Sequence, residues 1–294
     1  MISTYGLPAV LETLSVVVAA ERPVEASLLT ESPKTRLARS WHEYMRRREP
    51  AIPFIEVDSA QLPIFVGNGV AAQRLLDAFQ RACLIDSVDY VSPRYSAEET
   101  KALSESAERV TNALKQLGRD WPQVRGLYGL LLPVVLLAPA RGLAGGTASS
   151  IPGVLWAATK PTWSDVDLQE FLIHELVHTT LFLEERRYGF YHDMGLLLEN
   201  QNLVASAIRQ DRRPMDKVFH SIVVATEILL ARQKLGTDTA FSGAVHPDSE
   251  TLRAGARRSV EAARTLDLER LLMPRPIAII EQCCAYLDLV PAGR

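Results

Sequence analysis

LQEFLIHELVHTTLFL, residues 168–183, is apolar on nearly every face when it is drawn as an α-helix. A helix at the surface shows one polar face, so this pattern predicts a helix that is buried almost all round. The polar exceptions in the middle of the stretch are His174, Glu175 and His178. The stretch therefore predicts a core helix that carries three ionisable side chains.

His174, Glu175 and His178 form the pattern His-Glu-x-x-His. Residues four apart lie on the same face of a helix, so both imidazoles can be directed at one point. Glu175 is placed to take a proton from a metal-bound water or to hydrogen-bond a ligand. Burial of these groups without partners is costly, whereas one cation satisfies them together. The pattern therefore predicts that His174 and His178 are metal ligands and that Glu175 is catalytic.

A third ligand is needed, and Glu199 is one candidate. It lies 21 residues after His178 (199 − 178), close to the spacing of the downstream glutamate in thermolysin-like zinc peptidases. Those peptidases continue with an aspartate that holds a ligand histidine, and residues 200–203 contain none. The spacing keeps a zinc peptidase open as an alternative.

His220 is the other candidate, 42 residues after His178 (220 − 178). It falls just inside a helix that Pro214 is well placed to start, within an apolar run. The same setting suits a core histidine bonded to a carbonyl group, so this helix alone does not decide between the two roles. His192 and His246 are outside candidates whose surroundings are typical of surface groups.

Length and composition limit the class of protein. The chain has 294 residues, of which 47% are hydrophobic, so it can bury a full core and is not disordered. We expect a single domain, 1–294, with a helical N-terminal part, 1–120, and a metal-binding catalytic part, 121–294. The net charge of −3 comes from basic and acidic residues spread along the sequence, so nucleic acid is not an expected partner.

A cytoplasmic location is expected, without a membrane-spanning segment. The most hydrophobic run, 127–138, is shorter than the roughly 20 residues that a spanning helix needs. The apolar stretch 7–20 is interrupted by Glu12 and follows no cationic segment, so it does not resemble a signal peptide. Three cysteines without disulfide or metal spacing fit a reducing compartment.

The fold class predicted is α+β, mostly α-helical with one small β-sheet. Ser96 and Glu99 form a capping-box pattern at the start of one helix. Two or three strands and a glycine-rich loop are expected between residues 124 and 158, and Gly145-Gly146 there is interpreted as a turn rather than a phosphate loop. The helices are expected at 8–20, 35–48, 70–84, 97–117, 165–185, 196–210, 214–235, 249–266 and 276–287.

Three pieces of the chain together resemble the HExxH-type peptide modification proteins, which are iron(II)- and 2-oxoglutarate-dependent peptide β-hydroxylases. The pieces are the small-residue segment and strand 145–156, the helix 171–178, and the step from Arg213-Pro214 to His220. The resemblance covers roughly residues 141–235, and only the His-Glu-x-x-His element is highly specific by itself. One departure is Ser221, where the family has a glycine after the histidine.

The resemblance implies an iron(II) oxygenase that uses 2-oxoglutarate to hydroxylate a peptide, an amino acid or a carrier-bound amino acid. It implies that His220 is the third ligand, beside His174 and His178, and that Arg213 anchors the acidic cosubstrate. A guanidinium suits a carboxylate because its planar fork bonds both oxygens. Arg213 precedes His220 by seven residues (220 − 213), nearly two helical turns, so both are expected to face one cavity, with Arg209 and Arg212 as rivals.

Two other functions remain open. One is a zinc-dependent metallopeptidase or hydrolase with Glu175 as general base and Glu199 or His220 as third ligand. The other is a metal-free helical protein whose polar cluster fixes the packing. Histidine-rich sites accept several first-row metals, so the ligands alone do not identify the ion.

Overall fold

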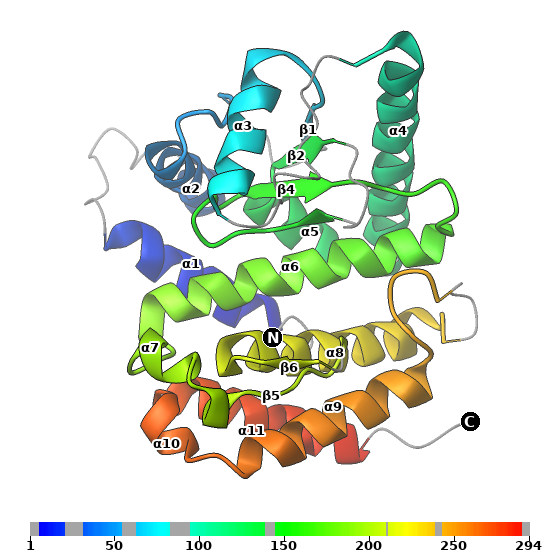
Figure 1. Ribbon diagram of the computed structural model, residues 1–294. Helices are drawn as coiled ribbons and strands as arrows, with labels where there is room; N and C mark the ends of the chain where they lie inside the picture. The colour runs from blue at the N-terminus through cyan, green and yellow to red at the C-terminus, as the bar shows by residue number, and fades with distance from the viewer. Residues whose placement is uncertain are drawn as a thin grey trace.

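The structure of the chain, a computed structural model shown in Figure 1, confirms a mostly helical α+β fold with a small sheet. The residues that the structure describes are 6–20, 32–54, 63–82, 95–138, 145–209, 211–238 and 243–289.

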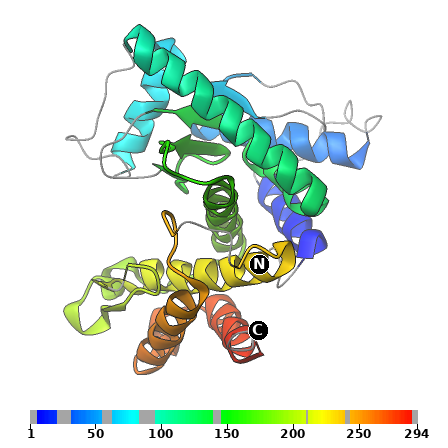
Figure 2. The same cartoon turned by 90° about the vertical axis from the view of Figure 1, so that its right-hand side faces the viewer.

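A four-stranded sheet lies on one side of the long helix α6 (Asp165–Tyr188), and helix α8 (Met215–Leu235) packs on the other side (Figures 1 and 2). The strand order is β1-β2-β4-β3. The first three of these are parallel, and β3 runs antiparallel to β4 along one edge. Their bounds are Ile64–Val66 (β1), Val134–Leu137 (β2), Gly145–Gly146 (β3) and Val154–Ala157 (β4).

The central strands β2 and β4 are short apolar runs in which every residue is buried. Parallel strands that are covered on both faces consist of such apolar runs. They lack the alternation of polar and apolar residues that a half-exposed strand shows. The prediction of strands in the run 127–138 is only half right, because residues 127–131 belong to helix α5 (Pro122–Leu131). Pro133 follows that helix and separates it from β2, since proline cannot continue a helix.

Helix α6 begins with a reciprocal capping box, in which the Ser164 hydroxyl accepts from the Asp167 N–H and the Asp167 carboxylate accepts from the Ser164 N–H. It ends before Gly189, whose φ of 64° lets the chain turn away. Most of its side chains are buried, including the carboxylate of Glu184, which ties neighbouring helices to it. The Thr13 hydroxyl donates to Glu184 Oε1 at 2.6 Å, and Arg275 Nε donates to Oε2 at 2.7 Å.

The N-terminal part is joined to the rest by a strand that the sequence did not predict. Strand β1 pairs with β2 in parallel, and helix α1 packs against α6, so residue 120 does not mark a break in the packing. The capping box predicted at Ser96 and Glu99 is confirmed at the start of α4. The helices of this part are α1 (Gly6–Ala19), α2 (Pro33–Arg48), α3 (Gly69–Arg81) and α4 (Ala97–Asp120).

The helix predicted over 196–210 is wrong. That region holds only a one-turn helix, a 3₁₀ turn and a two-stranded hairpin. One reason is that the Asn202 side chain donates to the carbonyl of Leu196 at 2.7 Å, a local bond that competes with helical bonding. The elements are α7 (Met194–Leu197), η2 (Asn200–Asn202), β5 (Val204–Ala205) and β6 (Arg212–Arg213).

The C-terminal helices pack on α8 and on each other below α6 (Figure 1). Their bounds are α9 (Ser249–Arg264), α10 (Leu268–Leu271) and α11 (Pro274–Leu289). Cys283 and Cys284 in α11 are buried free thiols, and burial raises the pKa of Cys283 to about 11. Cys83 lies outside the described residues. No helix in the described part of the chain has both the length and the apolar character needed to cross a membrane.

Gly145 lies at a very close contact in the edge strand β3, not in a simple turn. Its φ is +140°, and a Cβ at this position would lie 2.2 Å from the carbonyl oxygen of Trp156 and 2.8 Å from the Phe171 ring. No side chain fits there without moving the backbone of β4.

We therefore expect Gly145→Ala to lower the free energy of unfolding by about 1–3 kcal/mol, because both the backbone angle and the contact become strained. Urea unfolding of the purified variant measures this change. The matched control is Gly126→Ala in α5, where an added Cβ meets nothing within 4 Å. That substitution should stabilise the protein by up to about 1 kcal/mol, because alanine is the better helix former. Equal effects of the two changes would contradict the prediction.

Candidate metal centre

Helices α6 and α8 bring the three predicted histidines together. His174 and His178 lie one turn apart on α6, and their Nε2 atoms are 3.0 Å from each other. Nδ1 of His178 lies 2.9 Å from Nδ1 of His220, which α8 supplies. Pro214 caps the start of α8, as predicted, and this places His220 in its second turn. Phe182 covers this side with a ring that stacks against His178 and contacts His220.

A fourth histidine, His246, completes the group. The loop that precedes α9 rises beside α6 in Figures 1 and 2 and places His246 Nε2 2.8 Å from Nδ1 of His174. The expectation that His246 is a surface group is wrong, because its exposed fraction is 2%. A loop residue carries no periodic pattern, so nothing in the sequence marks this burial. His192, by contrast, is exposed as expected.

The four imidazoles form a row and not a ring around one point. Among the described residues, no group of three or more His, Cys, Asp or Glu side chains has the arrangement of a metal shell. The pair of Nε2 atoms on His174 and His178 nevertheless suits two neighbouring ligands. Two nitrogens that each lie about 2.1 Å from one ion are roughly 3.0–3.4 Å apart at octahedral to tetrahedral angles. The chain thus presents two ligand atoms at one point. Of the other two histidines, His246 lies next to His174 and His220 lies next to His178.

The histidines favour their neutral form, in which a nitrogen lone pair is available to a metal. Burial, helped by the charges of Lys217 and His246, lowers the pKa of His178 to about 4. Burial is also the main cause that holds the pKa values of His174 and His220 well below the usual range. The side chain of His174 still has 21% of its surface exposed, so the pair is not sealed from solvent.

Glu175 is buried beside this pair. Its Oε1 lies 3.8 Å from Nε2 of His174, and its Oε2 accepts a hydrogen bond of 2.9 Å from the hydroxyl of Thr147. Burial raises the pKa of Glu175 to about 7, although hydrogen bonds from Thr147 oppose the shift. Burial and then the Glu175 charge also raise the pKa of Tyr128, whose buried hydroxyl has no hydrogen-bond partner in the described part of the chain. Glu175 is therefore placed to exchange a proton near neutral pH.

A buried carboxylate, Glu170, supports the other end of the row. Its Oε2 lies 3.2 Å from Nδ1 of His246, and Arg232 donates to both of its oxygens at 2.6 and 3.0 Å. Burial by itself raises the pKa of Glu170, but the hydrogen bonds from His246 and Arg232 outweigh burial and leave the pKa below its usual value. The sequence did contain a signal for this residue, because Glu170 lies four positions before His174 on the same buried helix.

The structure does not bring Glu199 into the histidine row. Its carboxylate accepts hydrogen bonds from Gln201 at 2.8 Å and from Asn202 at 3.4 Å, both in the same turn. Within the described ranges, none of its hydrogen bonds goes to a histidine.

Arg213 lies in strand β6, before the helix that carries His220, so the expected spacing of two helical turns does not apply. Its Nε lies 3.0 Å from Oδ1 of Asp211, so this carboxylate already takes up part of the hydrogen-bonding capacity of the guanidinium.

Two other cations contribute positive potential at the row. Arg209 is one of the charges that lower the pKa of His174, and Lys217 does the same for His178 and His220. Arg209 lies at the end of a turn that α8 holds in place, since the Ser221 hydroxyl accepts from the N–H of Ala207 at 3.0 Å. The departure from the family pattern at Ser221 thus has a structural role in fixing this turn.

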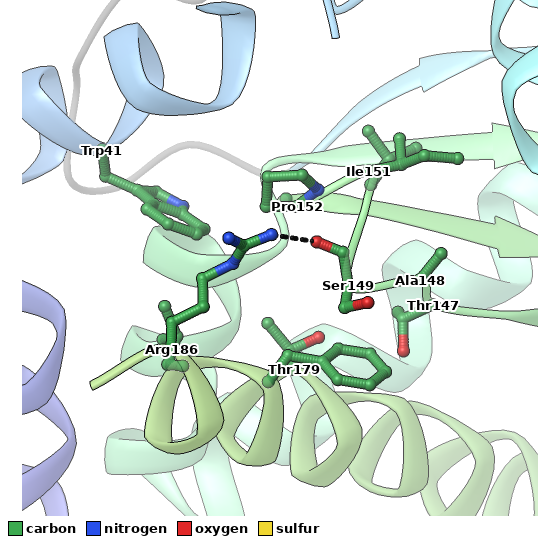
Figure 3. A pocket seen from close by; sticks show the side chains of 12 residues that line it. Trp41, Thr147, Ala148, Ser149, Ile151, Pro152, Thr179 and Arg186 are labelled. Carbon is green, nitrogen blue, oxygen red and sulfur yellow. Dashed lines mark hydrogen bonds between the residues drawn. The ribbon is translucent and has the colours of Figure 1, made fainter. Parts of the chain in front are cut away.

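A hollow lies next to the centre on the side of α2 (Figure 3). Thr147 and Phe182 line it, so it is separated from the histidines by the residues that hold Glu175 and cover His178. Figure 3 shows the guanidinium of Arg186 near the ring of Trp41, donating to the carbonyl of Ser149 at 2.7 Å.

In comparisons with known proteins, no family model and no curated protein matches this sequence.

Proposed function

We propose that the chain is a non-haem iron(II)- and 2-oxoglutarate-dependent oxygenase that hydroxylates a peptide, an amino acid or a carrier-bound amino acid. The observation that carries the proposal is the pair of facing Nε2 atoms of His174 and His178, 3.0 Å apart on a largely buried helix. Facing lone pairs at this distance repel each other unless a cation or a proton lies between them.

In this function, His174 and His178 hold the metal, and His220 remains the candidate for the third ligand that such a centre needs. Bound iron would activate dioxygen as the oxidant, with 2-oxoglutarate oxidised alongside the substrate, and so supply the chemistry that attacks an inert carbon–hydrogen bond. The protein contributes position and environment. Phe182 shields the His178 side of the centre, and Glu175, held by Thr147, orients groups beside the metal or receives a proton from them.

The surrounding charges favour an acidic cosubstrate. Arg209 and Lys217 add positive potential at the histidines, which attracts a dicarboxylate such as 2-oxoglutarate. The engagement of Glu199 within its own turn argues against the ligand set of a thermolysin-like peptidase.

A zinc-dependent hydrolase is the second candidate, and one observation favours it. Burial raises the pKa of Glu175 to about 7, which suits a general base that takes a proton from water near neutral pH. In that function, Glu175 would be indispensable, whereas an oxygenase needs no protein base for hydrogen abstraction.

The decisive experiment compares the two reactions on the purified chain. We expect succinate to form from 2-oxoglutarate under air with iron(II), and no succinate from His178→Ala. A peptide pool incubated with the zinc-loaded chain should stay intact. Peptide cleavage that Glu175→Gln abolishes, without any succinate formation, would establish the hydrolase instead.

The anchor of the cosubstrate can be tested separately. We expect Arg209→Ala to raise the KM for 2-oxoglutarate roughly 10-fold or more, because a charge-assisted hydrogen bond contributes about 1.5–3 kcal/mol. Arg213→Ala is the matched control from the same hairpin and should change the KM less than about 3-fold, since Asp211 holds Arg213. Steady-state succinate formation measures both. The opposite order of effects would restore Arg213 as the anchor.

A further inference from the structure

The row of imidazoles has a defined order, His246–His174–His178–His220. The facing atoms along it are Nε2 with Nδ1 at 2.8 Å, Nε2 with Nε2 at 3.0 Å, and Nδ1 with Nδ1 at 2.9 Å. A neutral imidazole has one N–H donor and one lone pair, so the role of one nitrogen decides the role of the other. Any fixed donor or acceptor at one end therefore determines tautomers along the row.

Glu170 is that fixed acceptor. An ionised carboxylate only accepts, so Nδ1 of His246 must carry the proton that points at Glu170 Oε2. Nε2 of His246 then has the lone pair and accepts from Nδ1–H of His174. This leaves the lone pair of His174 on Nε2, directed at His178. Arg232 fixes the carboxylate by donating to both of its oxygens.

The same logic continues to the other side. When no cation lies between the facing Nε2 atoms, Nε2–H of His178 donates to Nε2 of His174. Nδ1 of His178 then accepts from Nδ1–H of His220. His220 and His246 are both at least nine-tenths buried, with exposed fractions of 8% and 2%. Each can hold its neighbour in one orientation without competition from bulk water.

We propose that His246 is a positioning residue and not a metal ligand, and that, held by Glu170, it sets the tautomer that turns the Nε2 lone pair of His174 toward the metal site. This inference rests on the proposed metal centre. Hydrogen bonds of this kind, from the outer nitrogen of a ligand histidine, orient the ring and raise its affinity for metal.

The first test is the tautomer of each ring in the metal-free wild-type protein, labelled with ¹⁵N-histidine. Long-range ¹H–¹⁵N correlation spectra distinguish a proton on Nδ1 from one on Nε2. We expect His174, His246 and His220 to be protonated on Nδ1. A proton on Nε2 of His246 or of His174 would overturn the proposal. Because no metal is present, this result does not depend on the proposed function.

The second test measures binding of cobalt(II) alone, by its visible absorption, to a matched pair of variants. If His246 were a ligand, both variants would lose affinity, whereas a positioning residue can be replaced by a side chain that keeps the acceptor.

For His246 the matched pair is His246→Gln, which keeps an acceptor near the position of Nε2, and His246→Leu, which does not. We expect the glutamine variant to retain cobalt(II) affinity and the leucine variant to lose roughly 10–100-fold. Equal losses in both would contradict the positioning role. If the wild-type chain itself bound no cobalt(II), the proposed metal centre would fail, while the tautomers of the metal-free protein would still decide between the two hydrogen-bonding schemes.

Discussion

His174→Ala and His178→Ala will each lower the affinity for iron(II) or cobalt(II) by more than about 100-fold. Each removes one of the two Nε2 atoms that face each other, and this loss exceeds the roughly 10–100-fold effect of removing an outer partner. At a metal concentration of 100 times the Kd, bound ion stabilises the folded wild-type protein by about 2.7 kcal/mol. Neither variant will show this stabilisation.

Isothermal titration and thermal unfolding, each with and without metal, measure the two effects. The matched control is His192→Ala, which removes an exposed histidine whose neighbour Asp193 caps α7. That variant should bind metal and respond to it like the wild-type protein. Glu199→Ala should also keep its affinity, because Gln201 and Asn202 hold that carboxylate. Retention of metal by both α6 variants, or loss of it in His192→Ala, would exclude the assigned pair.

The core helix and the histidine pair could be predicted because both depend on local spacing. Apolar residues on every face of 168–183 require burial, and a separation of four residues on a helix brings His174 and His178 onto one face. The helix predicted over 196–210 was wrong. There the side chain of Asn202 bonds the backbone of Leu196 and competes with helical bonding.

The rest of the centre depends on contacts between distant segments, which spacing alone does not encode. His246 meets His174 across 72 positions of sequence and lies in a loop, where no periodicity marks a buried residue. Arg213 was placed by counting helical turns, but the helix begins only at Met215. Glu170 was the one visible clue, because a carboxylate within a buried helix needs a partner and therefore indicates a further cation or donor nearby.

Arg232→Met will lower the free energy of unfolding by about 3–5 kcal/mol, because it leaves the buried carboxylate of Glu170 without its strongest partner. Arg232 is 1% exposed and also donates to the hydroxyl of Ser249 at 3.0 Å. Methionine fills much of the same volume, so the loss comes from the charge and its hydrogen bonds and not from a cavity. Urea unfolding near pH 7 measures the change.

The pH dependence separates this cause from a general packing defect. In the wild-type protein, the pKa of Glu170 lies below its usual value, so its contribution to stability is present above the unfolded pKa and is lost as the pH falls through the folded pKa. Without Arg232, the effect of burial is less opposed, so the pKa of Glu170 in the folded protein rises. The carboxyl then takes up a proton more readily on acidification, which relieves the penalty. The difference in stability between variant and wild type should therefore shrink from about pH 7 to about pH 5.

The matched control is Arg264→Met, which breaks an ion pair of similar length at the surface. Arg264 Nη2 lies 2.7 Å from Glu281 Oε2, but both side chains are about half exposed. Solvent screens such a pair, so the substitution should cost less than about 1 kcal/mol and show little change with pH. If Arg232→Met were equally mild, Glu170 would not depend on its ion pair, and His246 alone would have to keep it charged. If the cost of Arg232→Met were large but constant with pH, its cause would be lost packing and not the unpaired charge of Glu170.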